Sequence, residues 1–428
     1  MKKYFCFWGG VALSAALLLL PAGQAEAKQA SRGAAAELAQ LVHSRTLPRV
    51  TLVWEMVPDA VSYEIELFYG SEYKEKNVFL RQREIYTNGV ELLQVPRGRE
   101  GAGTVHWRVQ GLDLDGNPVG APTQPCSLTA GLLEMNVPLT TGEMEEMDYA
   151  PLYPVYAWIP RAGAAKYEVE VLREENGLSR HLRYLYSDSH DVYDEEPLNR
   201  GGVYSWRVRA LDERERPVSQ WSEKRKLEIT APVQVAAFGD SITHGGGAAS
   251  VPPCYRLYAW ESYAGVPVKN LGCSGNTTEA MLQRFEADVL PFAPQVLVIM
   301  GGVNDFRMGE SAKESIHNLK AIRNKCRALG ITPVFATATP INPAKMAKVD
   351  YIENAAPNWR HEQRLLNEWI MKQRFAVDVN EGLTAADGTL KAELTADGLH
   401  PDSEGKRLIG EAIGNYLRLK KLAGNEAL

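Results

Sequence analysis

From Pro232 to the end of the chain, short apolar runs alternate with longer segments in which apolar residues recur every three or four positions. Unbroken apolar runs are typical of strands buried on both faces of a parallel sheet, and the longer segments have the period of amphipathic helices. This alternation predicts a three-layer α/β domain with a five-stranded parallel sheet. The expected strands are residues 233–238, 266–271, 296–300, 333–338 and 375–379, and the expected helices are residues 277–288, 311–329, 360–373 and 403–420.

The first half of the chain contains an internal repeat of about 100 residues. In each unit a tryptophan stands nine residues before a tyrosine, and a Trp-Arg-Val stretch follows later. In the second unit Tyr167, Val169 and Val171 alternate with glutamates, which predicts a strand with one buried face. Two such units predict two all-β sandwich modules. The equivalent residues are Trp54, Tyr63 and Trp107 in the first unit and Trp158, Tyr167 and Trp206 in the second.

Over residues 48–229 these units resemble fibronectin type III modules, through the repeated Trp and Tyr, the Trp-Arg-Val stretch and the pair Trp221-Ser222. The resemblance implies spacer or binding modules without catalytic chemistry, whose ligands could be carbohydrate or cell-surface components. The tryptophans could form a sugar-binding platform. Their repeat-equivalent positions favour core packing instead.

Residues 1–27 have the pattern of a cleaved signal peptide. Lys2 and Lys3 precede an apolar stretch at residues 4–20, and Ala25-Glu26-Ala27 fits a small-x-small cleavage site. An uncleaved membrane anchor is the alternative, but Pro21 ends the apolar run just before that site. We therefore expect a secreted, periplasmic or cell-surface protein. The expected plan is residues 1–27 signal peptide, 28–47 linker, 48–133 first module, 134–154 linker, 155–231 second module and 232–428 α/β domain.

Composition limits the possible partners. With 45% apolar and 23% charged residues in 428, the chain suits a soluble multi-domain protein, and its net charge of -6 gives no reason to expect nucleic acid or an anionic membrane. No CxxC or HExxH spacing occurs, so a metal is not expected. Beyond the signal peptide, sequence proximity favours a disulfide between Cys254 and Cys273, with four free buried thiols as the alternative. The four cysteines are Cys126, Cys254, Cys273 and Cys326.

Three chemically useful residues follow three successive predicted strands. Ser241 comes shortly after the first strand, Gly275 after the second and Asn304 after the third. Because open α/β sheets bind ligands outside the carboxyl ends of their strands, these residues are expected to form one site.

The same residues, with Asp397 and His400, supply the groups that acyl transfer from serine requires. Ser241 is the expected nucleophile, His400 the base that takes its proton, and Asp397 the carboxylate that fixes the imidazole tautomer. The expected oxyanion donors are the backbone N–H groups of Ser241 and Gly275 and the side-chain amide of Asn304.

Four blocks of the second half resemble the SGNH (GDSL-type) hydrolases: Gly239-Asp240-Ser241, Ser274-Gly275-Asn276-Thr277, Gly302-Val303-Asn304-Asp305 and Asp397-Gly398-Leu399-His400. They occur in the family's order and with similar spacing, and the similarity covers residues 233–417. The resemblance implies a flavodoxin-like sheet, Ser-His-Asp hydrolysis of esters and no cofactor. No GxSxG occurs, which disfavours the α/β-hydrolase fold.

Each residue also has a purely structural interpretation. Ser241 could cap a helix, Gly275 could mark a turn, Asn304 could satisfy loop backbone, and Asp397 could cap the last helix while His400 lies on the surface. His244 is expected to be an exposed loop residue, with substrate contact as the alternative. Residues 245–253 are expected to border the acyl or alcohol pocket, together with an aromatic cluster that could instead be core packing. That cluster is Tyr255, Tyr258, Trp260 and Tyr263.

These patterns together predict an exported serine esterase. Its expected substrate is a small-molecule or glycan ester, with deacylation of O-acylated extracellular carbohydrate as the first choice by analogy. A lysophospholipase or thioesterase-like lipid hydrolase and a non-catalytic surface binding protein are the alternatives.

Overall fold

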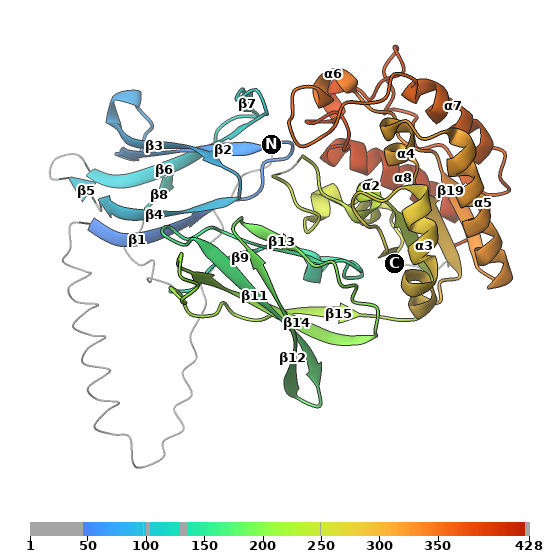
Figure 1. Cartoon of the computed structure of the whole chain (residues 1–428). Helices are drawn as coiled ribbons and strands as arrows, with labels where there is room; N and C mark the ends of the chain where they lie inside the picture. The colour runs from blue at the N-terminus through green and yellow to red at the C-terminus, as the bar shows by residue number, and fades with distance from the viewer. Residues whose placement is uncertain (1–45, 97, 100–102, 129–135, 249, 424–428) are drawn as a thin grey trace. The chain divides into compact units, whose positions relative to one another are not determined.

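The computed structural model describes residues 46–96, 98–99, 103–128, 136–248 and 250–423. The predicted signal peptide lies outside these residues. The described part of the chain separates into two compact units, one up to Asn136 together with Pro160–Ala162, and the other formed by Val137–Ile159 and everything from Gly163 onward. Figure 1 shows the elements of both units.

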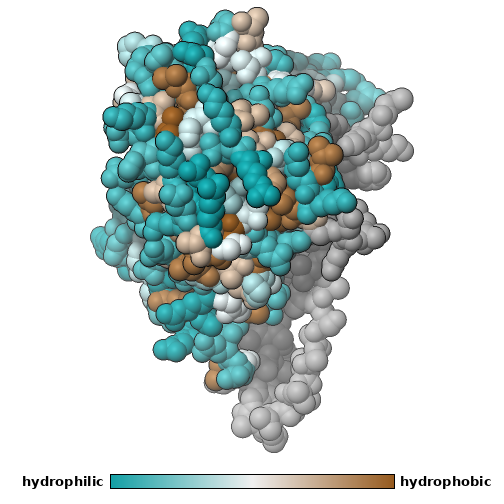
Figure 2. Space-filling model, turned by 90° about the vertical axis from the view of Figure 1, so that its right-hand side faces the viewer, coloured by the Kyte–Doolittle hydropathy of each residue, from teal (hydrophilic) through white to brown (hydrophobic). Residues whose placement is uncertain are grey.

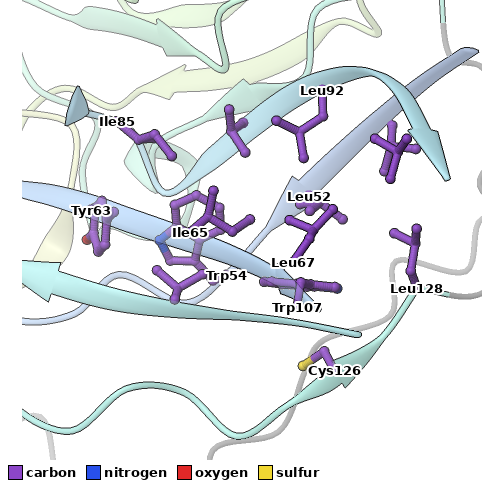
Figure 3. Close-up of a cluster of buried hydrophobic side chains, with 14 of the residues drawn as sticks. Leu52, Trp54, Tyr63, Ile65, Leu67, Ile85, Leu92, Trp107, Cys126 and Leu128 are labelled. Carbon is purple, nitrogen blue, oxygen red and sulfur yellow. The ribbon is translucent and has the colours of Figure 1, made fainter. Parts of the chain in front are cut away.

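The first unit is a pair of antiparallel sheets around one core. One sheet pairs β1 with β4, and the other has the order β3-β2-β6-β5, with β7 and β8 also paired to β6. Side chains from both sheets meet in a single cluster (Figure 3), where the Trp54 ring lies 5.3 Å from Tyr63 and 6.3 Å from Trp107. The strands are β1 (Thr46–Val53), β2 (Ser62–Tyr69), β3 (Val78–Ile85), β4 (Gly89–Pro96), β5 (Gly98–Arg99), β6 (Gly103–Leu112), β7 (Pro118–Val119) and β8 (Cys126–Ser127), with the short helix η1 (Glu75–Asn77).

The second module, which belongs to the second unit, repeats this pattern. Its sheets have the orders β13-β10-β9 and β12-β11-β14-β15. Trp158 packs 5.0 Å from Tyr167 and Tyr156 packs 4.9 Å from Trp206, all four almost fully buried. The predicted core role of the repeated tryptophans is therefore confirmed, while a fibronectin type III identity stays a prediction. The elements are β9 (Thr140–Thr141), η2 (Met144–Glu146), β10 (Val155–Trp158), β11 (Lys166–Glu175), β12 (Leu178–Ser187), β13 (Asp191–Tyr193), β14 (Gly202–Leu211) and β15 (Arg225–Ile229).

The α/β domain has the predicted five-stranded parallel sheet, in the order β17-β16-β18-β19-β20. With strands numbered along the domain this is 2-1-3-4-5, the flavodoxin-like order of doubly wound sheets. The outer strands β17 and β20 are each two residues long, shorter than predicted. The strands are β16 (Val235–Gly239), β17 (Lys269–Asn270), β18 (Val296–Met300), β19 (Thr332–Ala336) and β20 (Ala376–Val377).

Helices cover this sheet close to the predicted positions. In Figure 1 α3 and α5 lie side by side, and α5 in turn contacts α7. Helix α8 packs tightly on η4, where a Cβ on Gly414 would come within 1.8 Å of the Ala264 carbonyl oxygen. Glycine is therefore required for this approach. The longer helices are α3 (Thr278–Val289), α5 (Ala312–Ala328), α7 (Trp359–Ile370) and α8 (Ser403–Leu419). The shorter ones are α2 (Ser241–His244), η3 (Arg256–Tyr258), η4 (Trp260–Tyr263), η5 (Leu290–Phe292), α4 (Val303–Met308), α6 (Pro343–Met346) and η6 (Ala392–Leu394).

The segment that leads into β10 runs along the open edge of β17. The Leu152 N–H donates to the Asn270 carbonyl at 3.0 Å, and the fully buried Lys269 ammonium donates to the carbonyl of Ala150. The Tyr153 hydroxyl donates to Asp288 of α3 at 2.8 Å. Part of the predicted linker at residues 134–154 thus covers a sheet edge that would otherwise present unpaired backbone groups.

The predicted disulfide between Cys254 and Cys273 is wrong, because both are free thiols. The Cys254 sulfur is fully buried and lies so close to Gly142 that a Cβ there would be 3.1 Å away. The Cys273 sulfur instead lies 3.4 Å from the Tyr193 hydroxyl. The two thiols occupy different environments despite their proximity in sequence.

One face of the described residues is mostly polar. Figure 2, which views the side at the right of Figure 1, shows hydrophilic residues interrupted by small hydrophobic areas. Among the described residues, no helix combines the length and apolar character needed to cross a membrane.

Candidate active site

Four of the five predicted site residues line one cavity of about 630 Å³, and the fifth lies directly behind it. Ser241 opens α2 immediately after β16, and Asn304 lies in α4 just after β18. Gly275 follows β17, and His400 precedes α8. Asp397 is fully buried and contacts the His400 ring. The structure therefore brings together all the residues that the sequence places at the strand ends.

Ser241, His400 and Asp397 form a hydrogen-bonded chain. The His400 Nδ1 atom lies 2.8 Å from Asp397 Oδ2, and His400 Nε2 lies 3.0 Å from Ser241 Oγ. A carboxylate oxygen can only accept, so Nδ1 carries the proton and Nε2 is left to accept the serine proton. This is the tautomer that a general base next to serine needs.

The loop from Asp397 to His400 holds the carboxylate in place. Asp397 Oδ1 accepts the backbone N–H groups of Leu399 and His400, both at 2.9 Å. Burial alone would raise the pKa of Asp397, but the His400 imidazole and these N–H groups outweigh burial and hold the pKa below its usual value. The turn requires Gly398, whose φ is +84° and where a Cβ would lie 2.3 Å from the Asn342 carbonyl oxygen.

The alternative helix-capping roles belong to neighbouring residues. Asp240, and not Ser241, caps α2 by accepting the Ile242 N–H at 2.9 Å. Asp402, and not Asp397, caps α8. Ser241 and Asp397 therefore keep their side chains for the hydrogen-bonded chain with His400. Burial, with a smaller effect from the Asp305 carboxylate, raises the pKa of Asp240 to about 6.

The three predicted oxyanion donors border the cavity. Within the described residues the backbone N–H groups of Ser241 and Gly275 have no acceptor. The Asn304 side-chain amide donates one hydrogen to the Asn276 carbonyl at 3.0 Å, which leaves its second hydrogen free. Gly275 has φ +79°, and an added Cβ would meet no atom within 4 Å. Its backbone conformation, and not crowding, explains the glycine.

Asp305 has a structural role beside Asn304. Its carboxylate accepts the Thr278 N–H at 3.0 Å and the Ser315 hydroxyl at 3.1 Å, so it joins the starts of α3 and α5. Arg284 of α3 was not predicted from the sequence. Its guanidinium donates to the carbonyls of Gly239 at 2.7 Å and Leu271 at 2.9 Å. Arg284 thus ties together the ends of β16 and β17, from which Ser241 and Gly275 follow.

The prediction that His244 is an exposed loop residue is wrong. His244 is only 1% exposed, and its Nε2 lies 2.7 Å from the Tyr153 carbonyl oxygen while Nδ1 lies 2.8 Å from the Ser274 hydroxyl. Because a carbonyl only accepts, Nε2 is the protonated nitrogen and Nδ1 accepts from Ser274. Burial lowers the pKa of His244 to about 4, so the ring is neutral. His244 therefore connects the Tyr153 segment to the residue before Gly275.

Residues 245–253 and the aromatic cluster that follows them have different roles. Gly246, Val251 and Pro253 are among the residues lining the cavity, in agreement with the prediction. The aromatic residues of the following cluster pack instead. Trp260 is fully buried beneath α8, and the buried Tyr258 ring lies directly behind Gly247.

One wall of the cavity comes from the second module. Val155 of β10 and Asp191 and Tyr193 of β13 line the same space as Ser241 and His400. No sequence pattern indicates this contribution, because the module resembles a spacer and its strands carry no motif. Among the described residues, no group of His, Cys, Asp or Glu side chains could hold a metal ion.

Comparison with known proteins identifies the domain around this site. Residues 237–408 match the GDSL-like Lipase/Acylhydrolase family. The chain is 30% identical over 118 residues to the uncharacterized lipoprotein YqeF of Bacillus subtilis strain 168, which corresponds to 25% of this chain and 49% of that protein. The chain thus spans about half the length of this curated relative.

The solved structures that match part of this chain share little sequence identity with it. A putative lipolytic protein of the G-D-S-L family from Desulfitobacterium hafniense is 23% identical with a TM-score of 0.35, covering 43% of this chain and 99% of its own. A lipase/acylhydrolase from Enterococcus faecalis is 22% identical with a TM-score of 0.36, covering 44% and 96%. A mutant of an acetylxylan esterase from Geobacillus stearothermophilus is 21% identical with a TM-score of 0.33, covering 44% and 94%.

The family match supports a GDSL-like lipase/acylhydrolase domain over residues 237–408 of this chain.

Proposed function

We propose that this protein is an exported serine esterase that hydrolyses carboxylic esters through an acyl-Ser241 intermediate. The observation that carries the proposal is the chain of contacts from Ser241 Oγ to His400 Nε2 at 3.0 Å and from His400 Nδ1 to Asp397 at 2.8 Å.

In the acylation step, Ser241 Oγ attacks the ester carbonyl carbon while its proton passes to His400 Nε2. The buried Asp397 carboxylate stabilises the imidazolium that forms. The C–O bond to the alcohol then breaks, and the proton on Nε2 is transferred to the departing alcohol oxygen. Ser241 is left carrying the acyl group.

In the deacylation step, a water molecule gives a proton to His400 and attacks the acyl carbon. The tetrahedral intermediate collapses, Ser241 Oγ recovers the proton from His400, and the carboxylic acid leaves. In both steps the negative charge on the former carbonyl oxygen is stabilised by the N–H groups of Ser241 and Gly275 and by the free amide hydrogen of Asn304. Loss of one such donor costs about 10²–10³-fold in rate.

The first-choice substrate is an O-acylated extracellular carbohydrate. Asp191, Arg307 and Glu353 line the cavity together with Ser241, among apolar side chains such as Val155 and Leu399, and their polar groups can bind hydroxyls of the alcohol part of such an ester. The predicted signal peptide and the lipoprotein name of the Bacillus subtilis relative support export. In this proposal the two β-rich modules are fibronectin type III-like spacers or binding modules.

The test compares the wild type with Ser241→Ala on p-nitrophenyl esters of increasing acyl length. The variant is expected to lose on the order of 10⁴-fold or more in kcat/KM, because serine cannot be replaced as the nucleophile. Ser262→Ala, at an exposed serine of the same domain, is the matched control and should keep full activity. An inactive wild type would favour the binding-protein alternative, and a preference for long acyl chains would favour a lipid hydrolase.

A further inference from the structure

The second module presents two side chains of one strand to the active-site cavity. Asp191 and Tyr193 both lie in β13, two residues apart, and alternate residues of a strand share a face. Val155 of β10 pairs directly with Tyr193 and lines the same cavity. This wall therefore belongs to the module's sheet and not to a loop of the α/β domain.

Tyr193 is fixed against the loop that carries Gly275. Its hydroxyl lies 3.4 Å from the Cys273 sulfur, and its ring meets His244 edge to face at 5.3 Å. It also stacks near Tyr153, with ring centroids 6.2 Å apart. Contacts on three sides hold this part of β13 in a defined position relative to Ser241 and the oxyanion donors.

Asp191 is the unpaired acidic group on this wall. Other buried acidic side chains of the module are paired: Asp194 with Arg183 at 2.6 Å and Glu168 with Arg209 at 2.5 Å. Within the described residues the Asp191 carboxylate accepts no hydrogen bond and forms no ion pair. Burial raises its pKa, against the opposing effect of the adjacent His190. A partly buried carboxylate facing a cavity without a partner is suited to accept hydrogen bonds from a ligand.

The α/β domain contributes donors to the same cavity. Arg307 of α4 uses two of its guanidinium nitrogens on the Glu353 carbonyl at 3.3 Å and the Asn304 side-chain oxygen at 3.4 Å. A guanidinium has five N–H groups, so further donors remain for the cavity. The site thus pairs an acceptor from the module with a donor from the α/β domain.

We propose that Asp191 and Arg307 form a subsite for a hydroxyl-rich alcohol group of the ester, such as a sugar residue. Hydroxyl groups donate to Asp191 and accept from Arg307, so one polyol satisfies both walls. A hydrocarbon chain would leave both unpaired, and a cationic alcohol would pair with Asp191 but meet the positive charge of Arg307. The inference rests on the proposed esterase function and makes the second module a determinant of specificity.

The test uses three acetyl esters that differ only in the alcohol: 6-O-acetylglucose, p-nitrophenyl acetate and acetylcholine. The readout is selectivity, defined as kcat/KM for 6-O-acetylglucose or for acetylcholine divided by kcat/KM for p-nitrophenyl acetate. In Asp191→Ala the selectivity for 6-O-acetylglucose is expected to fall about tenfold or more, the size of a lost hydrogen bond to a charged group. In Asp191→Asn, which keeps the shape and one acceptor oxygen, it should fall about threefold.

Asp188→Asn, at an exposed acidic residue of the same module, is the matched control and should leave all selectivities unchanged. Unchanged sugar selectivity in both Asp191 variants would overturn the inference while leaving the esterase proposal intact. A selective loss on acetylcholine would also overturn it and assign the subsite to a cation. A wild type inactive on all three esters would overturn the esterase proposal itself and this inference with it.

Discussion

The two β modules share one sequence repeat but use it differently. In the first unit, two sheets close around Trp54, Tyr63 and Trp107, and the core is complete within the unit. In the second, the equivalent Trp158 and Tyr167 build a similar core, yet β13 and the segment before β10 pack against the α/β domain. The repeated aromatic residues therefore form the core of each module, while residues between them determine whether the module also contacts the α/β domain.

The largest expected effect comes from removing one buried tryptophan side chain from the core of each module. Trp206→Ala in the second module and Trp107→Ala in the first should each destabilise their own unit by about 3–5 kcal/mol, because each removes a buried indole. Only Trp206→Ala should lower the temperature at which esterase activity is lost, since its module is part of the compact unit that contains Ser241.

Calorimetry together with heat inactivation measures both effects. Trp107→Ala should shift an unfolding transition without moving the inactivation temperature. If both variants lose activity at the same lowered temperature, the two modules do not differ in their effect on the stability of the active site.

The pH dependence of stability gives the next largest effect. Native His244 has a pKa of about 4, whereas an unfolded histidine has a pKa near 6.5. Between these values the unfolded chain binds more protons, so the free energy of unfolding falls as pH drops from about 6.5 to 4, by about 3 kcal/mol from this residue. Asp240, whose pKa is raised to about 6, acts in the opposite direction, so the comparison must be made between variants.

His244→Gln removes the titrating ring while keeping a donor and an acceptor. Its unfolding free energy, measured by denaturant titration from pH 4 to 7, should fall less steeply toward acid than that of the wild type. Parallel curves for the two proteins would show that His244 is not buried in its neutral form.

A smaller effect is expected on turnover. His244→Phe breaks the link from Tyr153 to Ser274 and should lower kcat on p-nitrophenyl acetate by about 10- to 100-fold, because a displaced oxyanion loop stabilises the transition state less well. His244→Gln should recover part of the loss. The matched control is His106→Phe in the first unit, where His106 stacks on Phe68 and its Nδ1 lies 3.4 Å from the Thr104 carbonyl oxygen, and it should leave kcat unchanged.

The smallest effect separates the Tyr193 ring from its hydroxyl. Tyr193→Phe loses only the weak contact to the Cys273 sulfur and keeps the packing against His244. Its kcat/KM on p-nitrophenyl acetate should stay within about threefold of the wild type. A much larger loss would mean that the hydroxyl takes a direct part in the reaction.

Much of the α/β domain could be predicted from the sequence, because its strands are continuous apolar runs and its helices have a clear period. Strand β18 has the predicted bounds, and the parallel order follows from the alternation with helices. The meeting of Ser241, Gly275 and Asn304 could also be predicted, because parallel strands end at one edge of the sheet.

Other features could not be predicted because they depend on packing between distant segments. His244 is polar and precedes the glycine-rich residues 245–247, and its burial results from contacts with distant segments that contain Tyr153 and Ser274. Asp191 lies in an ordinary short strand, and nothing in its neighbours indicates a cavity. The disulfide was wrongly predicted for the same reason, because proximity in sequence does not place the Cys254 sulfur next to that of Cys273.

The most direct test of the central claim is covalent labelling with a fluorophosphonate, a reagent that reacts with activated serine hydroxyls, followed by mass mapping of the labelled peptide. We predict one equivalent attached at Ser241 in the wild type, and labelling at least about 100-fold slower in His400→Ala, because the hydroxyl then lacks its base. Labelling at another serine, or an equal rate in His400→Ala, would contradict the account.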